Sequence, residues 1–233
     1  MPDAFRSATA DAVTPATMLA AAEVTLLTLD DRQLNIVLVT SSDLPTRGRP
    51  SLPAVFVGAE EELDAAARRA LRDQIGRDAP VRQFLTTGGV DRVPGRRVIG
   101  IAYMALLPLT AVRPLLGERV QLHPLQDGVV RAPSGRRLTL PLAEDAIVAG
   151  ALADLKTHLD LSTWVFGLLA PEFSLRELQH AHEAIRGVAL NKPAFRKRLL
   201  ESGRLEPTGR RETDQRFRPA ELYRLREENA GGR

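Results

Sequence analysis

Positively charged side chains are concentrated near the carboxyl end of the chain. Residues 191–226 contain eleven Lys or Arg and five Asp or Glu, although the formal net charge of all 233 residues is only +3. Arginine forks match phosphate oxygens and guanine edges, and lysine neutralises phosphate as a point charge. This segment is therefore expected to bind double-stranded DNA through eight side chains: Lys192, Arg196, Lys197, Arg198, Arg210, Arg211, Arg216 and Arg218.

Two helices are expected to position these charges. The segment 174–186 begins with a capping box, because the Ser174 hydroxyl and the Glu177 carboxylate can each accept a backbone N–H of the first turn. A following helix is expected over 191–202, with Asn191 as its cap and most of the charges on its solvent side.

A basic hairpin is expected after these helices. Short strands at 204–206 and 220–225 flank a polar loop from Pro207 to Pro219 that carries four arginines. Helix, turn, helix and basic hairpin is the order of a winged helix-turn-helix domain, whose second helix enters the major groove and whose hairpin contacts phosphates.

The few histidines do not indicate a metal or catalytic site. His180 and His182 are two residues apart, so they diverge on a helix and cannot easily share a metal ion. His182 falls on the apolar stripe and is expected to be buried. The chain has no cysteine, which excludes disulfides and cysteine-ligated zinc.

The first two thirds of the chain alternate strands with helices. Aliphatic runs at 23–29 and 34–39 predict a hairpin, 97–107 predicts a strand, and apolar residues at helical spacing predict helices at 60–75 and 144–158. Weaker strand signals lie at 52–58, 81–86 and 129–141. The fold class is therefore expected to be α/β, ahead of the winged helix.

Composition bounds the setting of the protein. Hydrophobic residues make up 44% and charged residues 26% of the chain, which is ordinary for a globular protein, and no apolar run reaches the ~20 residues that span a bilayer. We expect a cytoplasmic protein without membrane contact. Its expected parts are a flexible tail over 1–21, a domain over 22–160, the winged helix over 161–228 and a tail over 229–233.

One helix resembles a degenerate metal-binding motif. The segments LPAVFV (52–57) and RRALRDQIG (68–76) resemble the Nudix box, in which carboxylates on adjacent helical turns hold Mg²⁺ against a pyrophosphate. Glu61 and Arg69 match the motif, whereas Ala70, Asp73 and Gln74 replace its helical glutamates. The resemblance implies that hydrolysis is absent or very slow, with no catalytic residue, metal or cofactor.

Longer segments resemble one family of regulators. The stretches RVIGIAYMALLP (97–108), FGLLAPEFSLRELQHAHEAIRG (166–187), FRKRLLESGRLEPTG (195–209) and RPAELYRL (218–225) resemble the Nudix-related transcriptional regulators of the NrtR family. The resemblance implies a Nudix-like mixed-sheet α/β/α sandwich followed by a carboxyl-terminal winged helix-turn-helix domain.

The resemblance also implies a function. Members of this family are dimeric repressors of NAD-metabolism genes that bind palindromic operators and sense ADP-ribose or a related nucleotide, and some relatives sense sugars. The residues expected to bind such an effector are Arg49, Glu61, Arg69, Asp73, Gln74, Arg92 and Tyr103.

Alternatives remain for single residues and for the whole chain. Arg69 has the spacing to pair with a helix neighbour, and Tyr103 has the setting of a core residue. The competing function is a divergent Nudix pyrophosphohydrolase that acts on a nucleoside-diphosphate derivative through Asp73 and Glu61.

Overall fold

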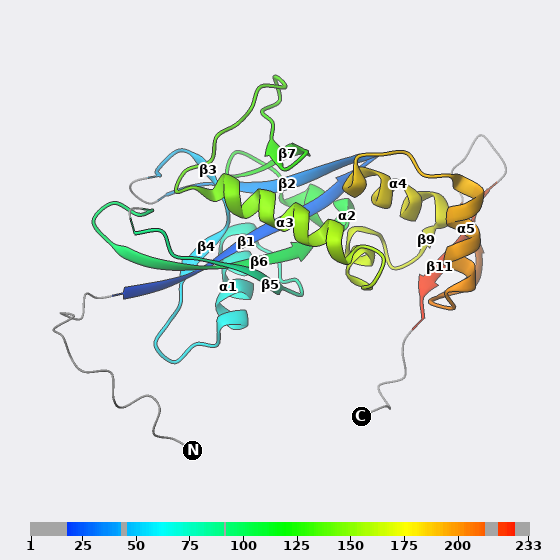
Figure 1. Cartoon of the computed structure of the whole chain (residues 1–233), viewed down its shortest axis with the longest axis horizontal. Coiled ribbons are helices and arrows are strands. Elements are labelled where there is room, and N and C mark those ends of the chain that lie inside the picture. The colour runs from blue at the N-terminus through cyan, green and yellow to red at the C-terminus, as the bar shows by residue number, and fades with distance from the viewer. Residues whose placement is uncertain (1–17, 43–45, 91, 213–218, 227–233) are drawn as a thin grey trace, which may run out of the picture.

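A mixed sheet organises the first module of the chain (Figure 1). The computed structural model describes residues 18–42, 46–90, 92–212 and 219–226. The sheet has the strand order β5-β6-β1-β2-β7-β8, with β3 paired to β2 and β4 paired to β1. Its strands are β1 (Met18–Asp30), β2 (Gln33–Thr40), β3 (Pro50–Ser51), β4 (Ala54–Phe56), β5 (Arg82–Thr87), β6 (Arg97–Leu106), β7 (Val120–Gln126) and β8 (Val129–Val130).

The hairpin of β1 and β2 confirms the first strand prediction. Leu26 lies opposite Val37, and Asp31 takes a positive φ of 52° in the turn, a conformation that Asp tolerates. The tail expected over 1–21 is wrong at its end, because β1 begins at Met18 and pairs there with Arg97 of β6. This pairing is parallel, whereas β1 is antiparallel to β2, so the sheet is mixed.

Helix α1 (Leu63–Ile75) covers one face of the sheet. Its buried face is made of three alanines, Leu71 and Ile75, which pack with Val24 and Leu26 of β1. The helix begins three residues later than expected, because Glu62 is extended and forms the N-cap. It ends where expected, at Gly76, whose φ of 78° suits a residue without a Cβ.

Helix α3 (Glu144–His158) covers the opposite face and has the predicted bounds. Its residues Ile147, Val148 and Leu152 are buried with the β1, β2 and β6 side chains that point away from α1. The two helices and the sheet therefore form the expected α/β/α sandwich. Two short helical segments, α2 (Leu109–Val112) and η1 (Arg113–Leu115), connect β6 to β7.

The second module is a winged helix. It contains η2 (Trp164–Leu168), α4 (Leu175–Arg186), α5 (Lys192–Glu201) and a three-stranded sheet in the order β10-β11-β9. The strands of this sheet are β9 (Phe173–Ser174), β10 (Leu205–Arg211) and β11 (Glu221–Leu225). The expected boundary at Pro207 is wrong: β10 continues through Pro207 to Arg211, because Pro207 still lies opposite Tyr223.

The two modules share one hydrophobic core. Leu152 and Leu155 of α3 belong to the same cluster of buried side chains as Leu178 and Ile185 of α4. Figure 1 shows α3 running along the sheet toward α4. None of the helices in the described ranges has the length and apolar composition that a bilayer-spanning helix requires.

Candidate functional site

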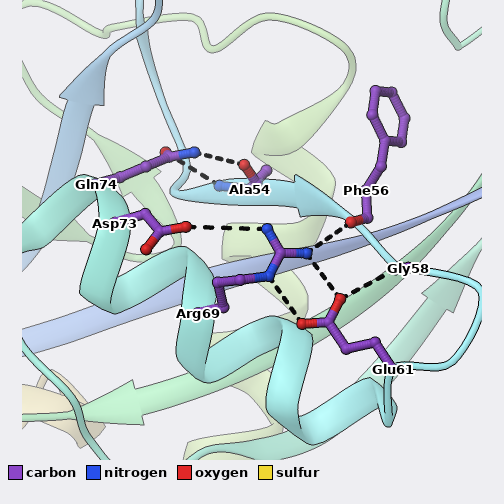
Figure 2. A network of polar contacts seen from close by, with 7 residues as sticks. All are labelled: Ala54, Phe56, Gly58, Glu61, Arg69, Asp73 and Gln74. Carbon is purple, nitrogen blue, oxygen red and sulfur yellow. Dashed lines mark hydrogen bonds and ion pairs between the residues drawn. The ribbon is translucent and has the colours of Figure 1, made fainter.

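The motif helix α1 carries a tightly paired arginine rather than a set of open carboxylates. Arg69 donates from Nε to Glu61 Oε1 at 2.8 Å and from Nη2 to Glu61 Oε2 at 2.7 Å, and it also donates to the Phe56 carbonyl at 2.9 Å (Figure 2). The Gly58 N–H donates to Glu61 Oε2 at 3.0 Å. The Arg69 guanidinium and this amide lower the pKa of Glu61 to about 2, so its carboxylate is ionised. Both of its oxygens already accept hydrogen bonds from the protein.

Gln74 stands where the motif has a glutamate, and it is bonded to the backbone of β4. Its Nε2 donates to the Ala54 carbonyl at 2.6 Å, and its Oε1 accepts the Ala54 N–H at 3.3 Å (Figure 2). Asp73 is more exposed, and its carboxylate lies 3.9 Å from Arg69 Nη1. No cluster of three His, Asp or Glu side chains suitable for a metal occurs within the described ranges.

A cavity of about 890 Å³ opens beside this helix. Its wall comes from β1, β2 and the loop after it, β3, β4, α1, the β5–β6 connection, the start of β6, Arg119 before β7, and Leu142 and Glu144 at the start of α3. The volume lies in the range of small-molecule sites. Three of the expected ligand residues line the cavity, namely Arg69, Gln74 and Arg92.

Four of the expected ligand residues are not brought to the cavity wall. Glu61 and Asp73 reach it only indirectly, through Arg69. Arg49 is exposed and donates to the Thr139 carbonyl at 3.4 Å. Tyr103 is fully buried between β6 and α1, where burial and Asp64 raise the pKa of its hydroxyl. It therefore lies in the core, which is the alternative expected for this residue.

The inner wall of the cavity contains a buried ion pair. Arg92 pairs with Glu23, and both side chains are almost fully buried. The same guanidinium donates to the Leu142 carbonyl at 2.8 Å and to Thr87 Oγ1 at 3.0 Å. Gly100 lies beneath this group, and a Cβ there would collide with Glu23, Arg92 and Thr87.

Glu144, the first residue of α3, is a second buried carboxyl group in the same wall. Its Oε2 accepts the Leu52 N–H at 3.0 Å. Burial raises the pKa of Glu144 to about 8, and the nearby Glu23 carboxylate adds to the shift. Leu142 and Ala143 just before it have positive φ values of 52° and 56°, and consecutive non-glycine residues in this conformation often occur at functional sites.

Sequence reasoning missed four charged residues of the cavity. Glu23 and Glu144 fall on a strand and a helix whose patterns indicate only structure, and Arg96 and Arg119 lie in connections. The available signal was weak: Glu23 interrupts an otherwise apolar strand, and such a charge in a buried strand needs a partner.

The charged face of the second module is built by two capped helices. The predicted capping box is present, since Ser174 Oγ accepts the Glu177 N–H at 3.3 Å and Glu177 Oε2 accepts the Ser174 N–H at 2.7 Å. Asn191 caps α5 by accepting the Ala194 N–H at 3.0 Å. Phe195 is buried, with its ring centroid 5.0 Å from that of His182, whose pKa is lowered to about 4 by burial.

The DNA-binding residues expected on α5 all lie on its solvent side. Lys192 and Arg196 are exposed and have no ion pair within the described part of the chain, and Lys197 is 3.8 Å from Glu201. Arg198 differs, because it lies 3.5 Å from Asp160 Oδ1 and against the Phe195 ring.

The expected wing residues divide between described and undescribed positions. Arg210 and Arg211 are exposed at the end of β10, and Arg210 donates to Glu172 at 3.2 Å. Arg216 and Arg218 lie outside the described residues.

Fold and site together define a class of protein: a transcriptional regulator with a Nudix-like domain and a carboxyl-terminal winged helix. Residues 165–225 match the family described as the NrtR DNA-binding winged helix domain. A relative from Acinetobacter baylyi, described as an ADPR responsive transcriptional repressor, is 31% identical over 87% of this chain and 80% of its own length.

Solved structures agree with this assignment. NrtR from Shewanella oneidensis in complex with a 27mer DNA is 26% identical, with a TM-score of 0.77 over 89% of this chain and 93% of that chain. The Nudix domain of the same protein, complexed with ADP ribose, is 24% identical, with a TM-score of 0.50 over 60% of this chain and 89% of that chain. The chain belongs to the NrtR family of Nudix-related transcriptional regulators.

Proposed function

We propose that this protein is a repressor that dissociates from its operator when a nucleotide binds the Nudix-like domain. The effector is ADP-ribose or a related diphosphate, as the names of the relatives indicate for those proteins. The repressor acts in the cytoplasm as a homodimer on a palindromic operator, because two-fold symmetric sites match two-fold symmetric proteins. The target genes belong to NAD metabolism or a related pathway.

The main support for this proposal is that α3 has the cavity at one end and the DNA-binding helices at the other. Glu144 at its first residue lines the cavity, and Asp160, just beyond its last residue His158, contacts both helices of the winged module. The Asp160 carboxylate pairs with Arg186 of α4 and lies 3.5 Å from Arg198 of α5. A packed helix of fifteen residues, about 22 Å long, thus connects the cavity to the DNA-binding helices.

This connection gives the effector a physical route to the operator. An effector changes a conformational equilibrium only through a difference in its affinity for two states. A shift of the α3 amino terminus on effector binding moves Asp160 and its partners, which changes the spacing of the two winged helices in a dimer.

Loss of hydrolase activity belongs to the same proposal. Ala70 is buried, Gln74 is bonded to the β4 backbone, and the Glu61 carboxylate is bound by Arg69. Magnesium prefers several oxygen ligands in octahedral geometry, and these side chains offer it only the exposed Asp73. Binding without turnover is the expected behaviour.

The test measures duplex binding and turnover on one preparation. The protein is titrated onto a labelled duplex from its own upstream region, with and without ADP-ribose, and the same ADP-ribose with Mg²⁺ is assayed for hydrolysis. We expect operator binding that ADP-ribose weakens at least tenfold, without product release. Brisk hydrolysis that Asp73→Ala abolishes would instead establish the pyrophosphohydrolase.

A further inference from the structure

Charged residues of opposite sign line different parts of the cavity: exposed arginines lie at its rim, and buried glutamates lie at its inner wall. Arg96 and Arg119 line it, are exposed and form no ion pair within the described part of the chain. Glu23 and Glu144 also line it but are only 4% and 3% exposed. A ligand in this cavity therefore meets cationic groups at the rim and carboxyl groups at the inner wall.

The buried guanidinium of Arg92 does not make the inner wall a phosphate-binding surface. Arg92 directs its donors to Glu23, Leu142 and Thr87, all of which belong to the protein. It holds the inner wall together and has little left to offer a phosphate. A phosphate placed beside Glu23 and Glu144 would lie against two carboxyl groups that share a single cation.

Each of the two carboxyl groups has an oxygen without a partner. Glu23 Oε2 has no hydrogen bond among the described residues, and it is buried against Gly100 rather than exposed in the cavity. Glu144 uses Oε2 to accept the Leu52 N–H, and no bond is made by its Oε1 in the described ranges. Buried polar groups in native proteins are normally paired, so the unpaired oxygen of Glu144, which lines the cavity, calls for a ligand group or an ordered water, and Glu23 beside it keeps that wall negative.

Hydroxyl groups suit these atoms better than a cation does. A hydroxyl can donate to an ionised carboxylate and can also accept from a protonated one. Burial favours the neutral, donating form of Glu144, since its pKa is about 8. A divalent cation would need more oxygen ligands than two carboxyl groups, one of which is already paired with Arg92.

We propose that Glu144, with Glu23 beside it, forms a hydroxyl-recognising subsite, so that a sugar ring of the effector lies inside the cavity and its phosphate lies at the Arg96 and Arg119 rim. The inference rests on the proposed sensing function, because it assigns specificity to the same cavity. Glu144 is in this account a specificity-determining residue at the start of α3.

Four variants and three probes test the subsite in the full-length protein. The probes are ribose 5-phosphate, 2-deoxyribose 5-phosphate and inorganic pyrophosphate, each titrated calorimetrically. The variants are Glu144→Ala, Glu144→Gln, Arg119→Ala and the exposed control Glu60→Gln. Glu144→Gln keeps one donor and one acceptor, which guards against misfolding of the alanine variant.

The expected pattern is specific to hydroxyl recognition. The unaltered protein binds ribose 5-phosphate at least tenfold more tightly than the deoxy compound, because a site built for a hydroxyl is left unpaired without it. Glu144→Ala removes this preference but leaves pyrophosphate affinity within threefold. Glu144→Gln and Glu60→Gln retain the preference, and Arg119→Ala weakens all three probes.

Three outcomes would overturn the subsite. These are equal affinity of the unaltered protein for the two sugars, no binding of either, or an equal loss of sugar and pyrophosphate binding in Glu144→Ala. Operator binding without any ligand is measured in parallel on the same preparations. It reports on the repressor function separately, since that function survives if another effector class fills the cavity.

Discussion

The carboxylate of Asp160 and the guanidinium of Arg198 lie 3.5 Å apart. This contact joins the segment just after α3 to α5, the helix expected to enter the major groove. Arg186 pairs with the same carboxylate, and His182 Nδ1 lies 3.9 Å from it. The ion pairs are partly solvent-exposed, so their contribution to stability is small, about 0–1 kcal/mol each. They connect α4 and α5 of the winged helix to the segment that follows α3.

The first prediction concerns this junction. Asp160→Asn is expected to leave operator affinity without effector within about threefold, but to reduce the weakening caused by ADP-ribose from tenfold or more to less than threefold. The reason is that the variant loses the ion pairs with Arg186 and Arg198, so a shift of α3 is no longer transmitted to α4 and α5. Fluorescence anisotropy with a labelled duplex measures both quantities.

A matched control separates this effect from a change in net charge. Asp78 also pairs with two arginines on the surface, Arg68 and Arg72, but it lies beside α1 and away from the winged helix. Asp78→Asn should keep the full effector response. An equal loss of response in both variants would remove Asp160 from the route.

The second prediction concerns the stability that Glu144 confers as a function of pH. The folded-state pKa of about 8 lies above the ordinary glutamate pKa of 4.5, so the folded state binds the extra proton between these values. Stability is therefore highest at low pH within this window and falls as pH rises from 4.5 through 8, by at most about 1.4 kcal/mol per pH unit. The charged groups that face Glu144 are Glu23, Arg92 and Asp145.

Urea denaturation between pH 6 and 9 measures this dependence. Glu144→Gln mimics the protonated side chain and should remove the Glu144 contribution, so that the variant is already more stable than the parent at pH 6 and its advantage grows until the pH exceeds the folded-state pKa of about 8. An unchanged slope in the variant would show that Glu144 titrates normally.

The third prediction concerns Gln74, which is tied to β4 by two backbone bonds. Gln74→Glu restores the glutamate of the hydrolase motif but replaces the donor to the Ala54 carbonyl with a carboxylate oxygen. Leaving that carbonyl unpaired is expected to cost about 1–3 kcal/mol of unfolding free energy. The exposed Gln83→Glu serves as the control.

No gain of ADP-ribose hydrolysis is expected in Gln74→Glu, because Ala70 still lacks a carboxylate and Glu61 is still bound by Arg69. The assay adds a phosphatase, which releases phosphate from the products of ADP-ribose hydrolysis, and measures that phosphate. Turnover in this single variant would mean that the metal site is nearly intact.

The fourth prediction concerns the DNA-binding face. Lys192→Ala and Arg196→Ala remove exposed cations of α5, and each that contacts a phosphate should reduce the slope of log affinity against log salt by about 1. Arg136→Ala removes an equally exposed arginine from the sensor domain and should leave the slope unchanged. Equal slopes in all three variants would place the DNA elsewhere.

Local signals made the scaffold predictable. The Ser174 capping box, the Asn191 cap and the apolar stripe of α3 each act within one or two helical turns, so sequence spacing contains them. Strand β7 was missed because His123 and Pro124 interrupt its apolar pattern.

The cavity was less predictable because tertiary structure assembles it. Glu23, Arg92 and Glu144 come from three distant segments, and their pairing depends on sheet register and on the unusual backbone at Leu142 and Ala143. The motif helix directed attention to Asp73 at the former metal site, and the strand that borders the expected pocket directed it to Tyr103. In this chain Asp73 faces solvent and Tyr103 is in the core.

The most direct test of the account is reciprocity between operator and effector. If both bind one protein and exclude each other through α3, then the factor by which ADP-ribose weakens operator affinity must equal the factor by which the operator duplex weakens ADP-ribose affinity. Paired calorimetric titrations at one salt concentration are expected to give the same factor, of ten or more, in both directions. Operator affinity that is identical at zero and saturating ADP-ribose would contradict the account.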